Sequence, residues 1–182
     1  MLPINDVNKV LDEADCLYDE VQIQEALKLM SNSMINELQN DNPLFLAVVS
    51  GAMIPIGHLL TRLHFPLELD YIHATRYDGE VRGAELKWLV EPRISLKGRV
   101  VVIVDDIYDE GYTLDAIIKY CMDNGATTVK SAVLVDKQHD RGVKLDLDYV
   151  GLTVPDRYVF GFGMDYKGYL RNANGIYAVK GM

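Results

Sequence analysis

The strongest constraint on the fold is the β-branched run RVVVIV at 99–104, followed at once by the acidic sequence DDIYDEGYT at 105–113. Val and Ile favour strands, and an uninterrupted apolar run predicts a strand that is buried on both faces. Similar runs at 44–49 (LFLAVV) and 128–135 predict two more buried strands. Strands of this kind occur in parallel sheets that are covered by helices, so the chain should fold as an α/β protein.

Helical segments separate the predicted strands. Residues 1–40 carry apolar side chains at three- and four-residue spacing, which predicts an N-terminal helical arm. Helices are also expected at 55–64 and 113–124, the second ending at Gly125. Strands that alternate with helices predict a mostly parallel sheet flanked by helices, in a single domain over residues 1–182.

The remaining segments have weaker patterns. Residues 67–74 have the character of an extended strand, whereas 75–92 are polar and predict a flexible loop or a loose hairpin. The tail from residue 149 is rich in glycine and aromatic residues, which indicates short strands and loops. No internal repeat is visible.

The charge balance limits the partners of the chain. It has 27 acidic against 18 basic residues and a formal net charge of −9. Nucleic acid and anionic membranes are bound through local Lys and Arg, so neither is an expected partner. The apolar runs are far shorter than the roughly 20 residues of a membrane span, and MLPINDVNKV lacks the apolar core of a signal peptide. A cytoplasmic protein is expected, and its two cysteines predict no disulfide framework.

The acidic sequence after RVVVIV has the composition of a ligand site. In open α/β sheets, ligands bind at the carboxyl ends of the strands, and a helix N-terminus attracts phosphate groups. Asp109 and Glu110 alone would suit a helix cap, but the acid pair before them and Gly111 after them favour a ligand. Clustered carboxylates repel one another unless a cation engages them, and Mg²⁺ prefers oxygen ligands. The segment therefore predicts a site for a phosphorylated ligand with Mg²⁺.

The stretch VVIVDDIYDEGYTL resembles the phosphoribosyl-pyrophosphate (PRPP) signature of the type I phosphoribosyltransferases, and its surroundings resemble the hypoxanthine-guanine branch of that family. The resemblance extends over residues 44–178. It implies a small base-binding hood formed by the chain ends, and a homo-dimer or homo-tetramer. It also implies a Mg²⁺-dependent transfer of hypoxanthine or guanine to PRPP, which yields IMP or GMP and pyrophosphate.

The resemblance assigns roles around the signature. Asp105 and Asp106 would hold the ribose hydroxyls, directly or through Mg²⁺, and Asp109 would be the general base at N7 of the purine. The loop for the 5′-phosphate would consist of Glu110, Gly111, Tyr112 and Thr113. Two positions depart from the family, which often has Thr in place of Glu110 and Lys in place of Tyr112. Because a carboxylate repels phosphate, Glu110 is expected to contribute its amide and not its side chain.

Further residues are assigned to pyrophosphate and metal by the same resemblance. The loop after the first buried strand would bind pyrophosphate, commonly through a cis peptide, which here would be Val49–Ser50. Asp165 would be a second Mg²⁺ ligand. The residues implied for pyrophosphate are Ser50, Gly51, Arg76 and Arg171.

The purine site is implied by three segments. Lys137 would donate to the 6-oxo group, and because an ammonium has donors only, it disfavours the amino group of adenine. Tyr158 and Val159 would sandwich the purine ring, and Ile107 would contact it. The four histidines show no metal spacing and no evident partner, so a structural role is expected for them.

Two alternatives belong to other classes of protein. One is a regulator of the same fold that binds PRPP or a purine nucleotide without useful turnover. The other is a receiver domain, suggested by the string IVDD, but receivers carry their acid pair after the first strand and not near residue 105. Intact Asp109 and Lys137 favour the enzyme.

Overall fold

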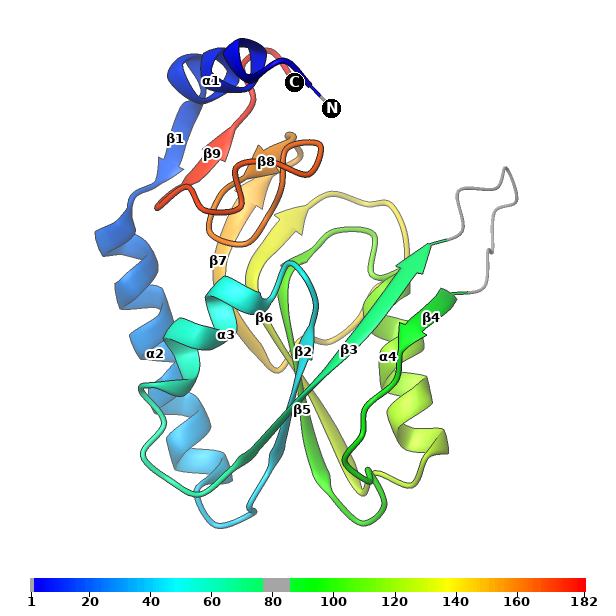
Figure 1. Ribbon diagram of the computed structural model, residues 1–182. Helices are drawn as coiled ribbons and strands as arrows, with labels where there is room; N and C mark the ends of the chain where they lie inside the picture. The colour runs from blue at the N-terminus through cyan, green and yellow to red at the C-terminus, as the bar shows by residue number, and fades with distance from the viewer. Residues whose placement is uncertain (1, 77–85) are drawn as a thin grey trace.

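The computed structural model describes residues 2–76 and 86–182. Its centre is a six-stranded sheet in the order β4-β3-β2-β5-β6-β7, in which only β4 runs antiparallel to its neighbour (Figure 1). This confirms the predicted mostly parallel sheet. The strands are β2 (Leu44–Val48), β3 (Glu68–Arg76), β4 (Leu86–Val90), β5 (Val100–Tyr108), β6 (Thr128–Gln138) and β7 (Tyr149–Pro155).

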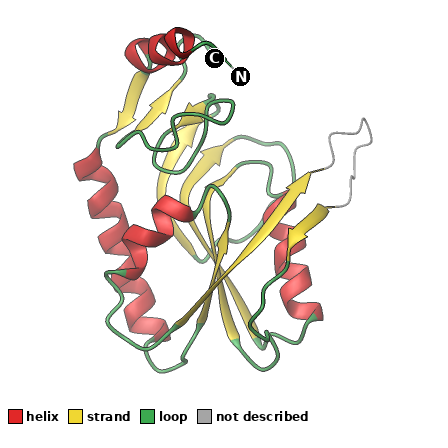
Figure 2. Ribbon diagram, viewed as in Figure 1, coloured by secondary structure: helices red, strands yellow, loops and turns green. Residues whose placement is uncertain are grey.

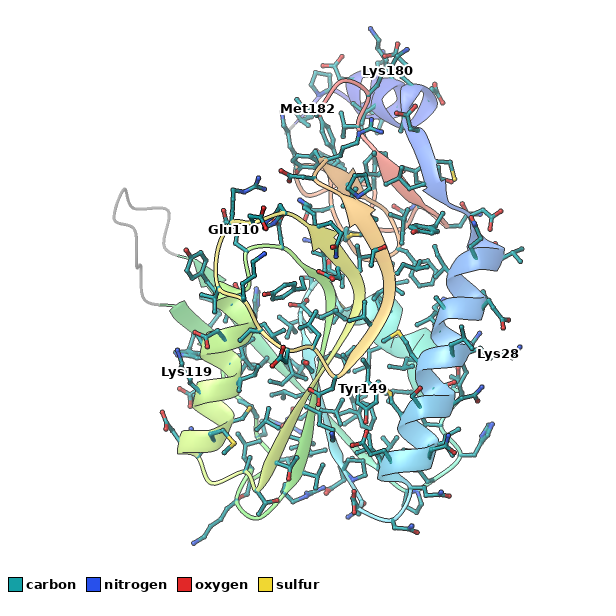
Figure 3. The ribbon with its side chains drawn as sticks, turned by 180° about the vertical axis from the view of Figure 1, so that it is seen from behind. Lys28, Glu110, Lys119, Tyr149, Lys180 and Met182 are labelled. Carbon is teal, nitrogen blue, oxygen red and sulfur yellow. The ribbon has the colours of Figure 1, made fainter. Side chains whose placement is uncertain are left out.

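Helices cover both faces of this sheet, as Figures 2 and 3 show. On one face, Phe45 and Ala47 of β2 lie in a core with α2 (Glu20–Leu38) and α3 (Met53–Leu60). On the other face, Leu46 of the same strand lies in a core with α4 (Tyr112–Asp123). Successive side chains of a strand point to opposite faces, so a continuous apolar run is required where both faces are buried.

The N-terminal arm differs from the expected helical run over residues 1–40. It contains α1 (Ile4–Glu13), then the short strand β1 (Asp15–Tyr18), and then α2. The break has a local cause: the Asp19 side chain accepts a hydrogen bond from the Gln22 amide, and the Gln22 side chain accepts one from the Asp19 amide. This capping box begins a new helix at Glu20 and leaves the preceding residues free to pair as a strand.

Segments from the two ends of the chain meet in a second, three-stranded sheet. Strand β9 (Ile176–Ala178) lies between β1 and β8 (Val159–Phe160), and both pairings are antiparallel (Figure 1). The Tyr18 hydroxyl donates to the Thr153 carbonyl oxygen of β7, which ties this sheet to the larger one. The small sheet therefore stands above the carboxyl ends of the parallel strands.

Strands β5 and β6 extend beyond the apolar runs that predicted them. The parallel pairing continues as far as Tyr108 opposite Asp136, so Asp105 and Asp106 lie within β5 and not after it. Backbone ladder bonds do not require apolar side chains, and this explains why composition underestimates the strand. Asp105 and Asp106 consequently lie on a regular strand, which fixes the direction of their side chains.

The expected flexible loop at 75–92 is only partly described. Strands β3 and β4 pair as a hairpin, with Ala74 opposite Trp88. Residues 77–85 between them lie outside the described residues, and so does the side chain of Arg76. Among the helices of the described part, none is long and apolar enough to cross a membrane.

Candidate active site

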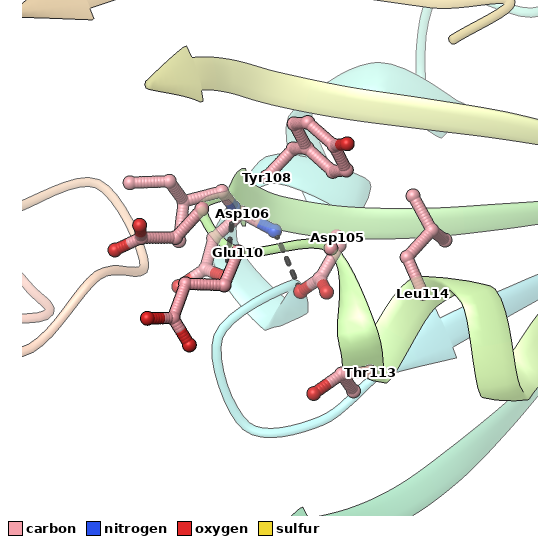
Figure 4. A pocket seen from close by; sticks show the side chains of 9 residues that line it. Asp105, Asp106, Tyr108, Glu110, Thr113 and Leu114 are labelled. Carbon is pink, nitrogen blue, oxygen red and sulfur yellow. Dashed lines mark hydrogen bonds between the residues drawn. The ribbon is translucent and has the colours of Figure 1, made fainter. Parts of the chain in front are cut away.

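The end of β5 and the start of α4 enclose a cavity of about 290 Å³. Gly111, the residue before α4, has a φ of +77°, and a Cβ there would lie 2.5 Å from the Val143 carbonyl oxygen. Only glycine fits this turn without strain. The cavity (Figure 4) is lined by Asp105, Asp106, Ile107, Tyr108, Asp109, Glu110, Gly111, Thr113 and Leu114. Acids of a strand end and residues of a helix start thus line one space.

Tyr112 differs from the other residues assigned to the phosphate loop. It is the first residue of α4, its side chain is 49% exposed, and it does not line the cavity. Glu110 does line the cavity, and its carbonyl oxygen accepts a hydrogen bond of 2.8 Å from the Val143 amide. The loop that begins at Glu110 is therefore hydrogen-bonded to the segment that follows β6.

The acid pair is electrostatically unfavourable in the absence of a ligand. Asp105 Oδ1 accepts from the Asp106 amide at 2.9 Å, and Asp106 Oδ1 accepts from the Ile107 amide at 2.9 Å (Figure 4). Burial raises the pKa of the Asp105 carboxyl well above its usual range, and the neighbouring charge of Asp106 adds to the rise. Burial also raises the pKa of Asp106, against the opposing effects of a side-chain hydrogen bond with Asp105 and of the charge of Arg171. Both acids favour a positive ligand.

We expect Asp105→Asn to stabilise the unliganded protein. The amide oxygen can still accept from the Asp106 amide, while the buried charge is removed. A carboxyl whose pKa is raised by folding lowers stability above its unfolded pKa, so the gain should be largest near neutral pH and shrink as the pH falls. Thermal unfolding should show a rise of about 2–4 °C at pH 7. An unchanged or lower midpoint at pH 7 would contradict this electrostatic account.

The donor set suits Mg²⁺ that arrives with a phosphorylated ligand. Mg²⁺ is usually held by one or two carboxylates together with substrate oxygens. Within residues 2–76 and 86–182, no group of three or more His, Cys, Asp or Glu side chains could hold a metal by itself. Asp105 and Asp106 are adjacent carboxylates that could hold the ion if the ligand supplied further oxygens. Asp165, the other predicted metal ligand, is instead paired with Arg171 at 2.6 Å.

Two of the residues assigned to pyrophosphate, Gly51 and Arg171, lie at Asp106. A Cβ on Gly51 would lie 2.2 Å from Asp106 Oδ2, so the loop after β2 packs directly on this carboxylate. Arg171 Nη1 lies 3.9 Å from the same oxygen, and Arg171 Nη2 contacts Asp165 Oδ1 at 2.6 Å. The Val49–Ser50 peptide is cis, as the family resemblance implies. Three segments distant in sequence thereby meet at one carboxylate.

The residues assigned to the purine line a second cavity, also of about 290 Å³. It shares Asp106, Ile107 and Asp109 with the first cavity, so the two spaces adjoin along β5. The Tyr158 ring packs edge-on against Tyr166, with 5.6 Å between ring centroids. The lining consists of Asp106, Ile107, Asp109, Lys137, Tyr158, Val159, Met164 and Asp165.

Asp109 is bound on both carboxylate oxygens. Lys137 Nζ donates to Oδ2 at 2.5 Å, and His139 Nε2 lies 2.7 Å from Oδ1. Burial acts to raise the pKa of Asp109, but the bonds from Lys137 and His139 outweigh it and hold this pKa below its usual value. Asp109 is therefore a carboxylate at neutral pH.

His139 has a partner that the sequence did not reveal, since its Nε2 lies 2.7 Å from Asp109 Oδ1. No metal spacing singles it out, but it lies two residues after Lys137, immediately beyond the end of β6. Residues i and i+2 of an extended backbone share one face, so the spacing from Lys137 is a signal for a shared neighbour where the chain stays extended past the strand. Arg141 lies two residues after His139 and does not take part in this contact. Its guanidinium donates two hydrogen bonds, of 2.5 and 2.8 Å, to the Asp156 carboxylate.

The parallel sheet, the acid pair and the adjoining cavities define a type I phosphoribosyltransferase. The chain belongs to the family described as "Phosphoribosyl transferase domain", which matches residues 14–167. A hypoxanthine-guanine phosphoribosyltransferase of Lactococcus lactis is 32% identical over 169 residues, covering 91% of this chain and 92% of that protein.

Two further proteins extend the comparison. A crystal structure of a hypoxanthine-guanine phosphoribosyltransferase from Bacillus anthracis is 27% identical, with a TM-score of 0.84, covering 91% of this chain and 97% of that one. The bifunctional protein TilS/HprT of Listeria monocytogenes is 34% identical over 92% of this chain. The chain spans only 25% of the length of that bifunctional relative.

Proposed function

We propose that the chain is a Mg²⁺-dependent purine phosphoribosyltransferase that joins hypoxanthine or guanine to PRPP. The observation that carries this proposal is the contact between Asp109 and Lys137 beside the wall that the two cavities share. One cavity would take the sugar phosphate and the other the base. The names of the relatives from Lactococcus lactis and Bacillus anthracis support the same substrates.

Donor and acceptor chemistry select a 6-oxopurine. The Lys137 ammonium can only donate, which suits an oxygen at C6 and not an amino group. The Asp109 carboxylate can only accept, which suits the N–H at N7 on the same edge of the purine. A purine that presents an oxo group beside N7–H satisfies both residues, and Tyr158 and Val159 line the cavity that would hold its ring.

The transfer redistributes charge in a way that the site complements. N9 of the purine bonds to C1 of the ribose as the C1–O bond breaks, and pyrophosphate leaves with the electron pair. The N7 proton passes to Asp109, so the base remains neutral overall. Positive charge that develops on the ribose is favoured by Asp105 and Asp106, and negative charge on pyrophosphate by Arg171. Mg²⁺ held by Asp105 and Asp106 would supply charge neutralisation for the PRPP oxygens.

A purine panel tests the proposal. The protein is incubated with Mg²⁺ and PRPP, and with hypoxanthine, guanine or adenine in separate reactions, and nucleotide formation is followed by chromatography. We expect IMP and GMP from the first two bases and little or no AMP from the third. The absence of product with both 6-oxopurines would refute the proposal, and equal use of adenine would refute the role of Lys137.

A further inference from the structure

Asp109 has two hydrogen-bond partners, Lys137 and His139, and under the proposed function only Lys137 must also bind the purine. Lys137 reaches Oδ2 from β6, and under the proposed function its ammonium must also donate to the purine. His139 contacts the opposite oxygen, Oδ1, and its side chain is only 5% exposed. Lys137 lines the purine cavity together with Asp109, whereas His139 does not, so the partner of Oδ2 is the one that a purine would meet.

The hydrogen bonds of His139 specify its tautomer. The Arg141 backbone amide, which can only donate, lies 3.1 Å from His139 Nδ1. Nδ1 must then present its lone pair, which places the ring proton on Nε2, the atom next to Asp109 Oδ1. The imidazole is therefore held at both nitrogens, as an acceptor from the backbone and a donor to Asp109.

The segment that carries His139 is itself fixed to the phosphate loop. Lys144 Nζ donates to the His139 carbonyl oxygen at 2.6 Å. The Val143 amide donates to the Glu110 carbonyl oxygen at 2.8 Å, and the Tyr108 hydroxyl donates to the Val143 carbonyl oxygen at 2.5 Å. His139 is thus positioned by the same segment that braces the loop beside Asp109.

We propose that His139 is a positioning residue, which holds Oδ1 of Asp109 while Oδ2 exchanges Lys137 for the purine N7–H. The inference rests on the proposed function. When Lys137 turns its ammonium toward the 6-oxo group, the described contacts leave His139 as the side chain that still orients the carboxylate. Without it, the carboxylate could rotate away from N7 after the purine binds.

The kinetic test compares His139→Leu with His139→Gln. Leu removes the donor at similar volume, whereas the Gln amide can place an N–H near the position of Nε2. We expect kcat with hypoxanthine to fall about 10- to 100-fold in His139→Leu, with the purine KM within about threefold of wild type. His139→Gln should recover most of the loss. His64→Leu, at an exposed histidine between α3 and β3, is the matched control and should keep wild-type kcat.

The possible outcomes separate the inference from the function on which it rests. A His139→Leu enzyme with kcat within threefold of wild type would overturn the positioning role, and so would equal losses in the Leu and Gln variants. A wild-type protein that forms no product would instead refute the proposed function.

Histidine ¹⁵N NMR of the folded wild type tests the inference independently. We expect the Nε2–H tautomer for His139, and finding the Nδ1–H tautomer would overturn the inference without a kinetic assay.

Discussion

Replacing Asp109 by Asn should lower kcat with hypoxanthine and guanine by about 10²–10⁴-fold, the usual contribution of a general base. The Asn side chain has nearly the same shape, but its amide cannot accept the N7 proton at neutral pH. Wild-type Asp109 can, because Lys137 and His139 keep it ionised and oriented. Steady-state kinetics with saturating PRPP and Mg²⁺ measure the effect.

Asp140→Asn is the matched control for the loss of a carboxylate. Asp140 lies on the same segment as His139, but its side chain is fully exposed and its ion pair with Lys144 spans 3.8 Å. We expect kcat of this variant to stay within about twofold of wild type, because an exposed ion pair contributes little. Equal activity of Asp109→Asn and wild type would remove Asp109 from its assigned role.

The second large effect is expected from Gly51→Ala. The added methyl carbon would lie 2.2 Å from Oδ2 and 2.6 Å from Oδ1 of Asp106. Either the loop after β2 or the carboxylate must then move, and a shift of about 1 Å at a reacting centre can cost 10²-fold in rate. We therefore expect kcat/KM for PRPP to fall by about 100-fold or more, while the Asp109–Lys137 contact, which Gly51 does not touch, is retained.

Gly57→Ala provides the control for a glycine-to-alanine change. Gly57 lies in α3, and no atom would be within 4 Å of an added Cβ. Alanine favours a helix interior by about 1 kcal/mol over glycine, so this variant should be active and somewhat more stable in urea unfolding. If Gly51→Ala used PRPP as well as Gly57→Ala does, the close approach of Gly51 to Asp106 would have no functional importance.

Much of the fold could be predicted because burial leaves a strong signal in the sequence. The runs at 44–49, 99–104 and 128–135 all correspond to parallel strands whose two faces are covered by helices. The site residues of β5 and α4 could be predicted for a related reason. They are contiguous in sequence, so one short segment contains both the acids and the helix start.

The features that escaped prediction depend on contacts between distant segments. Strand β1 exists because it pairs with β9 from the other end of the chain, and nothing in the local pattern of 15–18 shows that partner. Arg171 could be assigned to the site only through the family resemblance, because its approach to Asp106 depends on the tail folding back over β5. His139 is an intermediate case, since its spacing from Lys137 was visible, whereas its contact with Asp109 requires β5 and β6 to be adjacent.

The most direct test of a catalytic role is to count products per protein molecule. Purified protein is mixed with Mg²⁺, excess PRPP and excess hypoxanthine, and IMP and pyrophosphate are quantified over time. An enzyme should form both products in equal amounts and many times over per chain, and Asp109→Asn should nearly abolish their formation. A regulator of the same fold would bind PRPP or IMP and form no product, and that result would contradict the account.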